Sequence, residues 1–253
     1  MSTTTPAADT AVIIPMYNEC ENAAAIIDAV LALSVPVDIL VIDDNSPDGT
    51  AAIVKSKMEE YPGRVHLIER AGKLGLGTAY IEGFKWCLAH GYEFICEMDA
   101  DFSHNPADLL RLRSTAIDDK ADVVIGSRYV SGVNVVNWPM GRVLMSYYAS
   151  KYVRLITGLP VHDTTAGFVC YRRRVLEALD LDAIRFKGYA FQIEMKFTAY
   201  KYGFKVVEVP IIFVNRVLGT SKMNSGIFGE AVFGVIRLKW DSLFRHYPDH
   251  SAK

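Results

Sequence analysis

Short apolar runs rich in β-branched residues alternate with longer stretches of helical periodicity along the first half of the chain. Polar or turn-forming residues bound each apolar run, which is typical of strands, and the stretches between them are long enough for helices. Such strand–helix alternation predicts a mostly parallel sheet flanked by helices. Strands are expected at residues 11–15, 37–43, 65–69, 94–98 and 121–126, and helices at 19–33, from Ser46-Pro47, at 78–90 and from Asn105-Pro106.

The second half of the chain has a less regular pattern. Helices are expected at 140–157, 191–202 and 227–244, and strands at 167–171 and 205–214. Pro210 interrupts the last of these strands, which indicates an edge strand or a bend. Because no repeat or linker breaks the pattern, we expect a single α/β domain that ends in amphipathic helices.

Composition limits the class of protein. The 253 residues are 51% hydrophobic, and the formal net charge is −2. Since nucleic-acid binding depends on basic residues that neutralise phosphates, we do not expect a nucleic-acid partner. Neither a secretory signal nor an apolar run of the ~18–20 residues that span a bilayer is apparent. Of the four cysteines, three lie in apolar stretches and none in metal-ligand spacing, which favours buried thiols and a reducing cytosol.

Two pairs of acidic residues follow expected strands. Asp99 and Asp101 come directly after the apolar run 94–98, and Asp43-Asp44 follow another such run. Open α/β sheets bind ligands at the carboxyl ends of their strands, and Mg²⁺ usually takes one or two carboxylates together with substrate phosphates. A turn whose aspartates only cap the next helix would explain either pair alone. Because the pattern occurs twice, we expect a metal–diphosphate clamp at this edge.

The first strand ends in the sequence Pro15-Met16-Tyr17-Asn18-Glu19. Asn18 fits a helix N-cap, which would explain a simple turn. The same turn also suits a nucleotide, because the Tyr17 ring can lie against a planar base. Glu19 can accept a hydrogen bond from a sugar hydroxyl or a base edge, and Asp44 can accept one from a base N–H. The three strand-end turns together predict a nucleoside diphosphate site.

Basic residues that suit phosphate groups follow in the second half. Arg128, Arg216 and Lys222 lie in turns among small residues, where a phosphate can approach closely. Charged residues in loops are often only solvated, and this alternative applies to each of them. Arg142 is a weaker candidate, and Arg172-Arg173-Arg174 are typical of a solvated helix start.

A glycine-rich segment, Lys73-Leu74-Gly75-Leu76-Gly77-Thr78-Ala79, follows the third expected strand. A dinucleotide-binding fold would place G-x-G-x-x-G after the first strand, where this chain has residues 15–19. The glycine spacing differs as well, so we expect a close-packed turn into the next helix and set a Rossmann dehydrogenase aside.

These motifs occur in the order found in a known family. They read P-M-Y-N-E (15–19), I-D-D-N-S-P-D-G-T (42–50), K-L-G-L-G-T-A-Y (73–80), M-D-A-D-F-S-H (98–104), G-S-R-Y (126–129) and R-V-L-G-T-S-K (216–222). Over roughly residues 12–222 the chain resembles the dolichyl- or polyprenyl-phosphate mannosyltransferases, a branch of the family 2 glycosyltransferases with the GT-A fold. The acidic motifs indicate only the broad family, whereas 73–80 and the Arg–Lys pair are typical of the lipid-phosphate branch.

The resemblance implies roles for individual residues. Asp101 would be the chief ligand of a Mg²⁺ or Mn²⁺ ion, and Arg128 is the first choice for the acceptor phosphate. The residues implied at the nucleotide sugar are Pro15, Tyr17, Glu19, Ile42, Asp44, Asp99, Ala100, Asp101, Arg128, Arg216 and Lys222, and those implied at the metal are Asp99, Ala100 and Asp101. Some relatives carry Gln where this chain has Ser103, so the rest of the metal shell departs from the pattern. His104 lies nearby, but imidazole is not a favoured Mg²⁺ ligand.

The reaction implied by the resemblance is a metal-dependent, inverting transfer of mannose from GDP-mannose to a polyprenyl (dolichyl) monophosphate. A phosphate monoester with a second pKa near ~6 is already anionic at neutral pH, so no general base is required. The protein would supply electrostatic stabilisation instead. Residues of about 11–128 would bind the nucleotide, and about 129–247 would serve the acceptor and the membrane. The alternatives are another donor such as UDP-glucose, a non-lipid acceptor, or a binding module without catalysis.

A lipid acceptor implies contact with a membrane surface. The expected helices 140–157 and 227–244 combine aromatic and basic residues, as interfacial helices do, although packing on their own sheet explains most of these residues equally well. We expect one face to pack and Trp240, Phe244 and neighbouring basic residues to lie nearer the lipid. The expected location is the cytosolic face of a membrane, and a membrane-anchoring partner subunit would be one way to reach it.

Overall fold

The computed structural model describes residues 8–188, 190–216 and 226–251, with side chains of the last range from 233 onward. Its centre is a seven-stranded sheet with the strand order β3-β2-β1-β4-β7-β5-β8. β7 runs antiparallel to both of its neighbours, and the other neighbouring strands are parallel. The strands are β1 (Thr10–Met16), β2 (Asp38–Asp43), β3 (Val65–Glu69), β4 (Phe94–Glu97), β5 (Val123–Ser127), β7 (Val169–Arg172) and β8 (Val206–Pro210), and a separate parallel pair is formed by β6 (Val135–Val136) and β9 (Phe213–Val214).

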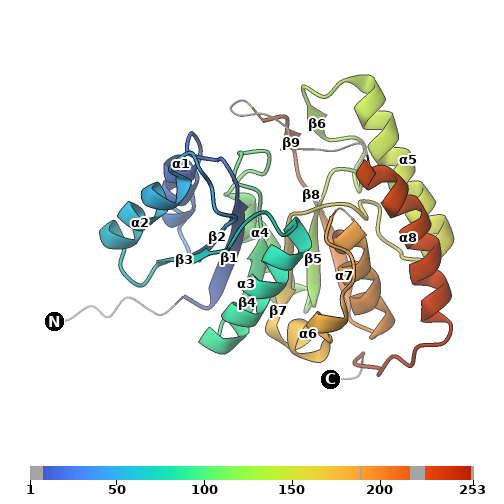
Figure 1. Ribbon diagram of the computed structural model, residues 1–253. Coiled ribbons are helices and arrows are strands. Elements are labelled where there is room, and N and C mark those ends of the chain that lie inside the picture. The colour runs from blue at the N-terminus through green and yellow to red at the C-terminus, as the bar shows by residue number, and fades with distance from the viewer. Residues whose placement is uncertain (1–7, 189, 217–225, 252–253) are drawn as a thin grey trace.

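Helices cover both faces of the sheet, so the mostly parallel α/β fold expected from the sequence is confirmed (Figure 1). One apolar cluster joins the sheet to α3, α6 and α7, and a second cluster joins its other face to α1, α2 and α4. The helices are α1 (Ala23–Leu31), α2 (Thr50–Glu60), α3 (Leu76–His90), α4 (Asp108–Asp118), α5 (Met140–Thr157), α6 (Arg173–Ala178), α7 (Ala190–Lys201) and α8 (Gly226–Ser242), with a 3₁₀ turn at Leu181–Ala183.

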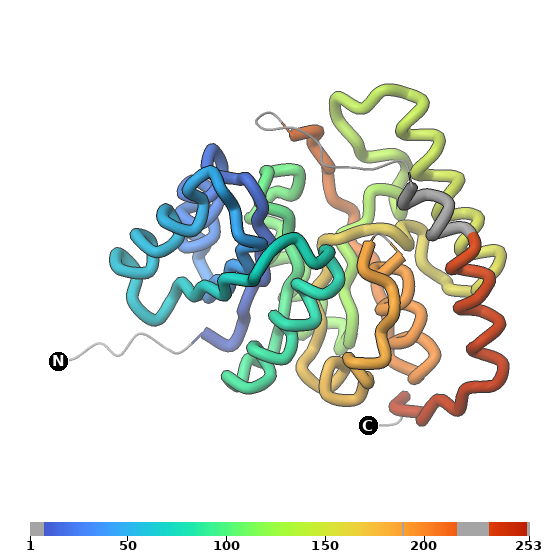
Figure 2. Tube along the Cα trace, in the orientation of Figure 1, coloured from blue at the N-terminus to red at the C-terminus, as the bar shows by residue number. Residues whose placement is uncertain are grey.

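Two long helices form an additional layer outside α7. A small cluster of Val153 on α5, Ile193 on α7 and Val235 on α8 holds them together. Figure 2 shows the chain from its N-terminus to β4, in blue to green, beside the yellow to red second half, and β7 of that half lies between β4 and β5. Among the described residues, no helix combines the length and the apolar character needed to cross a membrane.

The helix expected from Ser46-Pro47 begins four residues later, at Thr50. Ser46 does not cap a helix, because its hydroxyl donates to Asp43 Oδ1 at 2.6 Å and its N–H donates to Asp43 Oδ2 at 2.9 Å. Asp48 instead accepts a hydrogen bond from the Thr50 N–H at 3.1 Å. Competition from a neighbouring carboxylate therefore turned the expected cap into part of the strand-end loop.

The expected strand at 205–214 is divided in two. Pro210 ends β8, which lies at the edge of the large sheet, as the proline indicated. The chain then leaves the sheet and β9 pairs with β6. The two-residue strand β6 was not expected, because an element of this length carries too little periodicity to be recognised. The helix start indicated by Arg172-Arg173-Arg174 is confirmed, since α6 begins at Arg173.

Candidate active site

The carboxyl ends of β1, β2 and β4 meet at one edge of the sheet, because these strands are parallel neighbours. Each of the three following loops contains a non-glycine residue in the left-handed backbone region: Asn18 (φ 53°), Asn45 (φ 58°) and Phe102 (φ 58°). Asparagine tolerates this conformation, whereas a bulky aromatic residue rarely adopts it. Backbone strain of this kind is typical of functional sites, and here it lies where the sequence predicted one.

Asp44 is held in place by a buried arginine. Arg70 donates from Nε to Asp44 Oδ1 at 2.6 Å, and it is fixed in turn by Thr78 Oγ1 at 2.7 Å and by the Gly75 carbonyl at 3.3 Å. Burial raises the pKa of Asp44 more than the guanidinium lowers it. The sequence reasoning did not identify Arg70, although its position directly after the third expected strand was a usable signal. The glycine-rich turn thus supports an arginine through the Gly75 carbonyl and the Thr78 hydroxyl.

The loop after β1 is tied to the loop after β2. The Glu19 N–H donates to Thr50 Oγ1 at 3.0 Å, and the Glu19 carboxylate accepts from Asn22 Nδ2 at 2.8 Å. The Lys73 ammonium lies 5.2 Å from the centre of the Tyr17 ring. Pro15 and Ile42 are register partners on β1 and β2, and the Ile42 side chain is fully buried in the core. A nucleotide contact at Ile42 would therefore involve its main chain.

Asp101 and Arg216 form the centre of the site. Arg216 Nη2 lies 2.6 Å from Asp101 Oδ2, and its Nη1 lies 3.8 Å from Glu19 Oε1. The other oxygen of Asp101 accepts the Ser103 N–H at 3.0 Å. The segment after β9 therefore brings a predicted phosphate-binding arginine against two predicted donor-site carboxylates. Lys222, the partner of Arg216 in the motif, lies outside the described residues.

Asp99 lies beside this pair and is the more open carboxylate, with 43% of its side chain exposed. Its pKa is raised to about 7, first by burial and then by the neighbouring charge of Asp101. Because solvent reaches the side chain, water offsets part of the first cause. The Asp99 N–H points to His104 Nδ1 at 3.4 Å. His104 is buried against Phe168, and burial lowers its pKa to about 4, so it supports the backbone here as a neutral ring.

The donor set at the end of β4 fits a hard divalent cation. Asp99 and Asp101 offer carboxylate oxygens, and a positive group, the Arg216 guanidinium, already contacts Asp101. No cluster of three or more candidate ligand side chains occurs in the described parts of the chain. The remaining ligands of an ion here would therefore be diphosphate oxygens or water, which is the usual arrangement for Mg²⁺.

Arg128 is engaged in a buried ion pair at the end of β5. Its Nε and Nη2 each lie 2.7 Å from a different oxygen of Asp163, and the Arg128 N–H donates to the same carboxylate at 2.9 Å. Burial opposes ionisation of Asp163, but the guanidinium holds its pKa below the usual range. The Arg128 guanidinium also lies 5.5 Å from the rings of both Trp138 and Phe213. Asp163 belongs to a polar turn that carried no expected role in the sequence.

The weaker basic candidates have different environments. Arg142 stacks on Trp138, with 4.0 Å from guanidinium to ring centre, and donates to Asn215 Oδ1 at 3.1 Å. It therefore lies on the same tryptophan as Arg128. Arg172 and Arg174, by contrast, donate to the Ala121 carbonyl and to Asp122 at the opposite end of β5. These two arginines support the fold and not this edge of the sheet.

Comparison with known proteins now decides the family. Residues 11–180 match the model of glycosyl transferase family 2. The chain belongs to this family. It is a glycosyltransferase, as the motifs predicted, and the family's GT-A-type fold agrees with the sheet described above.

Two curated relatives of this glycosyltransferase are similar over almost its whole length. It is 49% identical to the polyprenol monophosphomannose synthase of Mycolicibacterium smegmatis, over 92% of this chain and 88% of that one. It is 47% identical to the undecaprenyl-phosphate mannosyltransferase of Micrococcus luteus, over 91% and 96% of the two chains. These relatives confirm the resemblance to the polyprenyl-phosphate mannosyltransferase branch.

Solved structures share the fold of this glycosyltransferase at low sequence identity. A glucosyl-3-phosphoglycerate synthase from Mycobacterium tuberculosis, solved with Mn²⁺, UDP and glucosyl-3-phosphoglycerate, matches with a TM-score of 0.64 and 16% identity, over 95% of this chain and 81% of that one. A mannosyltransferase from Pyrobaculum calidifontis, solved with GDP-Man and Mn²⁺, matches with a TM-score of 0.58 and 19% identity, over 95% and 65%.

Proposed function

We propose that this glycosyltransferase transfers mannose from GDP-mannose to a polyprenyl monophosphate, with inversion, and releases GDP. The observation that carries the proposal is the identity of 47–49%, over more than nine-tenths of the chain, to two relatives named for the synthesis of polyprenyl-phosphate mannose. The GDP-mannose donor is further supported by the GDP-Man complex of a structural relative with the same fold.

The donor would lie along the ends of β1, β2 and β4. Asp44, oriented by Arg70, would accept hydrogen bonds from the base, and Tyr17 and Glu19 would contact the nucleoside. A divalent ion held by Asp99 and Asp101 would supply positive charge to the departing diphosphate. Arg216, already 2.6 Å from Asp101, would add a second positive charge at the same place. Preorganised charges of this kind are commonly the largest contribution to catalysis.

The acceptor phosphate would lie on the side of the site formed by Arg128, Arg142 and Trp138. Its oxygen would form a bond to the anomeric carbon as the bond from that carbon to the β-phosphate oxygen of GDP breaks. The electron pair leaves with GDP, so no proton has to move. The low basicity of His104, whose pKa is lowered to about 4 by burial and whose Nδ1 faces the Asp99 N–H, agrees with a site that needs no general base.

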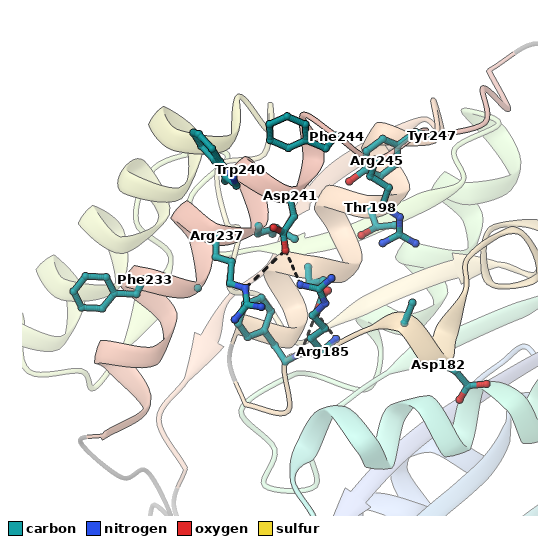
Figure 3. Close-up of a pocket in the computed structure, with 15 residues that line it drawn as sticks. Asp182, Arg185, Thr198, Phe233, Arg237, Trp240, Asp241, Phe244, Arg245 and Tyr247 are labelled. Carbon is teal, nitrogen blue, oxygen red and sulfur yellow. Dashed lines mark hydrogen bonds and ion pairs between the residues drawn. The ribbon is translucent and has the colours of Figure 1, made fainter.

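A membrane surface would supply the lipid acceptor. Figure 3 shows Phe233, Trp240 and Phe244 on α8 and just beyond it, at a pocket of about 1200 Å³ that Arg185 and Arg237 also line. These three aromatic side chains are exposed, as the sequence suggested for Trp240 and Phe244, whereas Val235 on the same helix packs inward. Exposed aromatic and basic residues suit an interfacial helix. The cytosolic side remains a prediction, and the names of the two relatives do not mention an anchoring subunit.

The test is transfer of radiolabelled mannose from GDP-mannose into an organic-extractable product, with a polyprenyl phosphate in detergent and Mg²⁺ or Mn²⁺. UDP-glucose is the parallel donor, Asp101→Ala is the inactive variant, and Asp118→Ala on the exposed end of α4 is the matched control. We expect labelled lipid from GDP-mannose alone, loss with Asp101→Ala or a chelator, and recovery on adding metal back. Labelling from UDP-glucose instead would overturn the donor, and release of GDP without lipid product would overturn the acceptor.

Membrane contact has its own test in liposome flotation with anionic lipid. The protein is expected to float with the vesicles, and Trp240→Ala combined with Phe244→Ala is expected to weaken this binding. Tyr200→Ala, an exposed aromatic on α7, is the matched control. A protein that stays wholly in solution would contradict the peripheral location.

A further inference from the structure

The turn at residues 162–166, which carries Asp163, is held from two sides by opposite charges. On one side the carboxylate of Glu208, on β8, accepts the His162 N–H at 2.7 Å and the Asp163 N–H at 2.9 Å. On the other side the ammonium of Lys196, on α7, donates to the Ala166 carbonyl at 2.6 Å. The Glu208 carboxylate thus accepts hydrogen bonds from N–H groups of the turn, and the Lys196 ammonium donates hydrogen bonds to its carbonyl oxygens.

Lys196 is fully buried, which is rare for lysine. Its other hydrogen bonds go to the Thr164 carbonyl at 3.4 Å and to the carbonyl and the side-chain oxygen of Gln192, both at 3.2 Å. Burial lowers its pKa to about 8, while the nearby charges of Glu97 and Asp163 oppose this shift. A buried charge is costly to retain, and neither the donor site nor the apolar core accounts for it.

The network also reaches the strand that carries the acidic pair. Gln192 accepts from Lys196 with its side-chain oxygen and donates from Nε2 to Glu97 Oε2 at 2.9 Å. Glu97 ends β4, two residues before Asp99. One buried chain of hydrogen bonds therefore connects the donor edge of the site to the turn that holds Arg128.

We propose that Lys196 is a positioning residue, which fixes the turn at 162–166 and, through Asp163, the guanidinium of Arg128 for the acceptor phosphate. This inference rests on the proposed role of Arg128. Asp163 accepts two hydrogen bonds of 2.7 Å from Arg128 in a bidentate arrangement, so a displacement of the turn moves the guanidinium with it. An apolar side chain at 196 would leave the carbonyls of Thr164 and Ala166 without their buried donor.

The experiment replaces Lys196 with methionine, which keeps the unbranched shape and removes the ammonium. We expect kcat/KM for a polyprenyl phosphate to fall roughly 10–100-fold, as for other small displacements of a reacting group. The Kd of GDP, measured by calorimetry, should change by less than about twofold. Lys201→Met, an exposed lysine on the same helix, is the matched control. Because Glu97 loses its cation, Lys196→Met combined with Glu97→Gln serves if the single variant does not fold.

Proportional loss of GDP affinity and acceptor kinetics would show a merely structural role and overturn the proposal. A second arm adds Lys196→Met to Arg128→Ala, where we expect a further loss of less than about twofold because the lysine acts through the arginine. If Lys196→Met lowers kcat/KM in the Arg128→Ala protein as much as it does in the wild type, the proposal is also overturned. If Arg128→Ala alone leaves acceptor kinetics unchanged, the proposed role of Arg128 fails as well; if it impairs them and Lys196→Met does not, only this inference fails.

Discussion

Replacing Asp163 with asparagine tests the energetic importance of the buried Arg128–Asp163 pair. Asp163 is completely buried, and each of its oxygens accepts a charge-assisted hydrogen bond from the guanidinium at 2.7 Å. Hydrogen bonds to charged groups contribute about 1.5–3 kcal/mol each. Removing one partner of a buried ion pair costs about 3–5 kcal/mol, because the other charge remains buried. Asparagine keeps one acceptor oxygen, so we expect a loss of about 3 kcal/mol in the free energy of unfolding, and about 5 kcal/mol for Asp163→Ala.

Urea unfolding followed by circular dichroism measures this loss as a lower midpoint with an unchanged slope. Asp118→Asn, an exposed aspartate, is the matched control and should leave the midpoint in place. The pH dependence provides a second check. Because Arg128 holds the pKa of Asp163 below its usual range, the stabilisation is fully present above about pH 4 and is lost as the pH falls through the lowered value. The difference in the free energy of unfolding between wild type and Asp163→Asn should therefore be constant near neutral pH and become smaller in acid.

A loss below about 1 kcal/mol at pH 7 would refute this reasoning, because it would place the pair among solvent-screened surface ion pairs. A difference between the two proteins that does not narrow in acid would show that the asparagine acts through packing and not through the lost charge.

Three further predictions concern the strand-end loops and the core. Arg70→Met should weaken GDP binding about tenfold in calorimetry, because Asp44 loses the ion pair that orients it. Arg64→Met, which removes an ion pair at the other end of β2, should leave GDP binding unchanged, and equal effects of the two variants would contradict the role assigned to Arg70. Gly83→Ala should lower the free energy of unfolding by about 1–3 kcal/mol, because the added methyl would lie 2.8 Å from the Ile13 side chain in the core. Gly72→Ala, where the added methyl meets open space, is the control, and equal melting temperatures of the two variants would contradict this packing. Arg216→Ala should reduce kcat about 10²–10³-fold with little change in melting temperature, and unaltered turnover would remove it from the site.

The sequence was sufficient for the features that depend on local pattern. Alternating apolar runs located β1 to β5, and the acidic residues at the ends of β2 and β4 marked the edge at which the donor site is proposed. Gly91 and Gly203 end α3 and α7 with left-handed φ values of 85° and 81°, as expected of glycine after a helix. These signals are contained within a few residues, so neighbouring residues alone reveal them.

Features that depend on distant partners were not accessible in the same way. Arg128 was expected at a phosphate from its position in a turn, but nothing near it in sequence indicated that Asp163 would hold it. Arg70 likewise reaches Asp44 only because β3 lies beside β2. Ser46 shows the opposite limit, since its local pattern predicted a helix cap and a carboxylate three residues earlier took the hydroxyl instead. Glu97 belonged to an apolar run, and its buried hydrogen-bond partner, Gln192, comes from the distant helix α7.

The contact of Arg216 with Glu19 and Asp101 has a consequence for the order in which the site is made during synthesis. Glu19 belongs to the first loop of the chain, whereas Arg216 follows the last strand. Domains generally fold as units, and Arg216 is synthesised after every strand of the large sheet. A ribosome-bound chain that still lacks residue 216 therefore has both carboxylates but not the guanidinium that contacts them. The charges at the end of β4 are matched only once the segment after β9 has docked, so the proposed donor site is completed by a part of the domain that leaves the ribosome late.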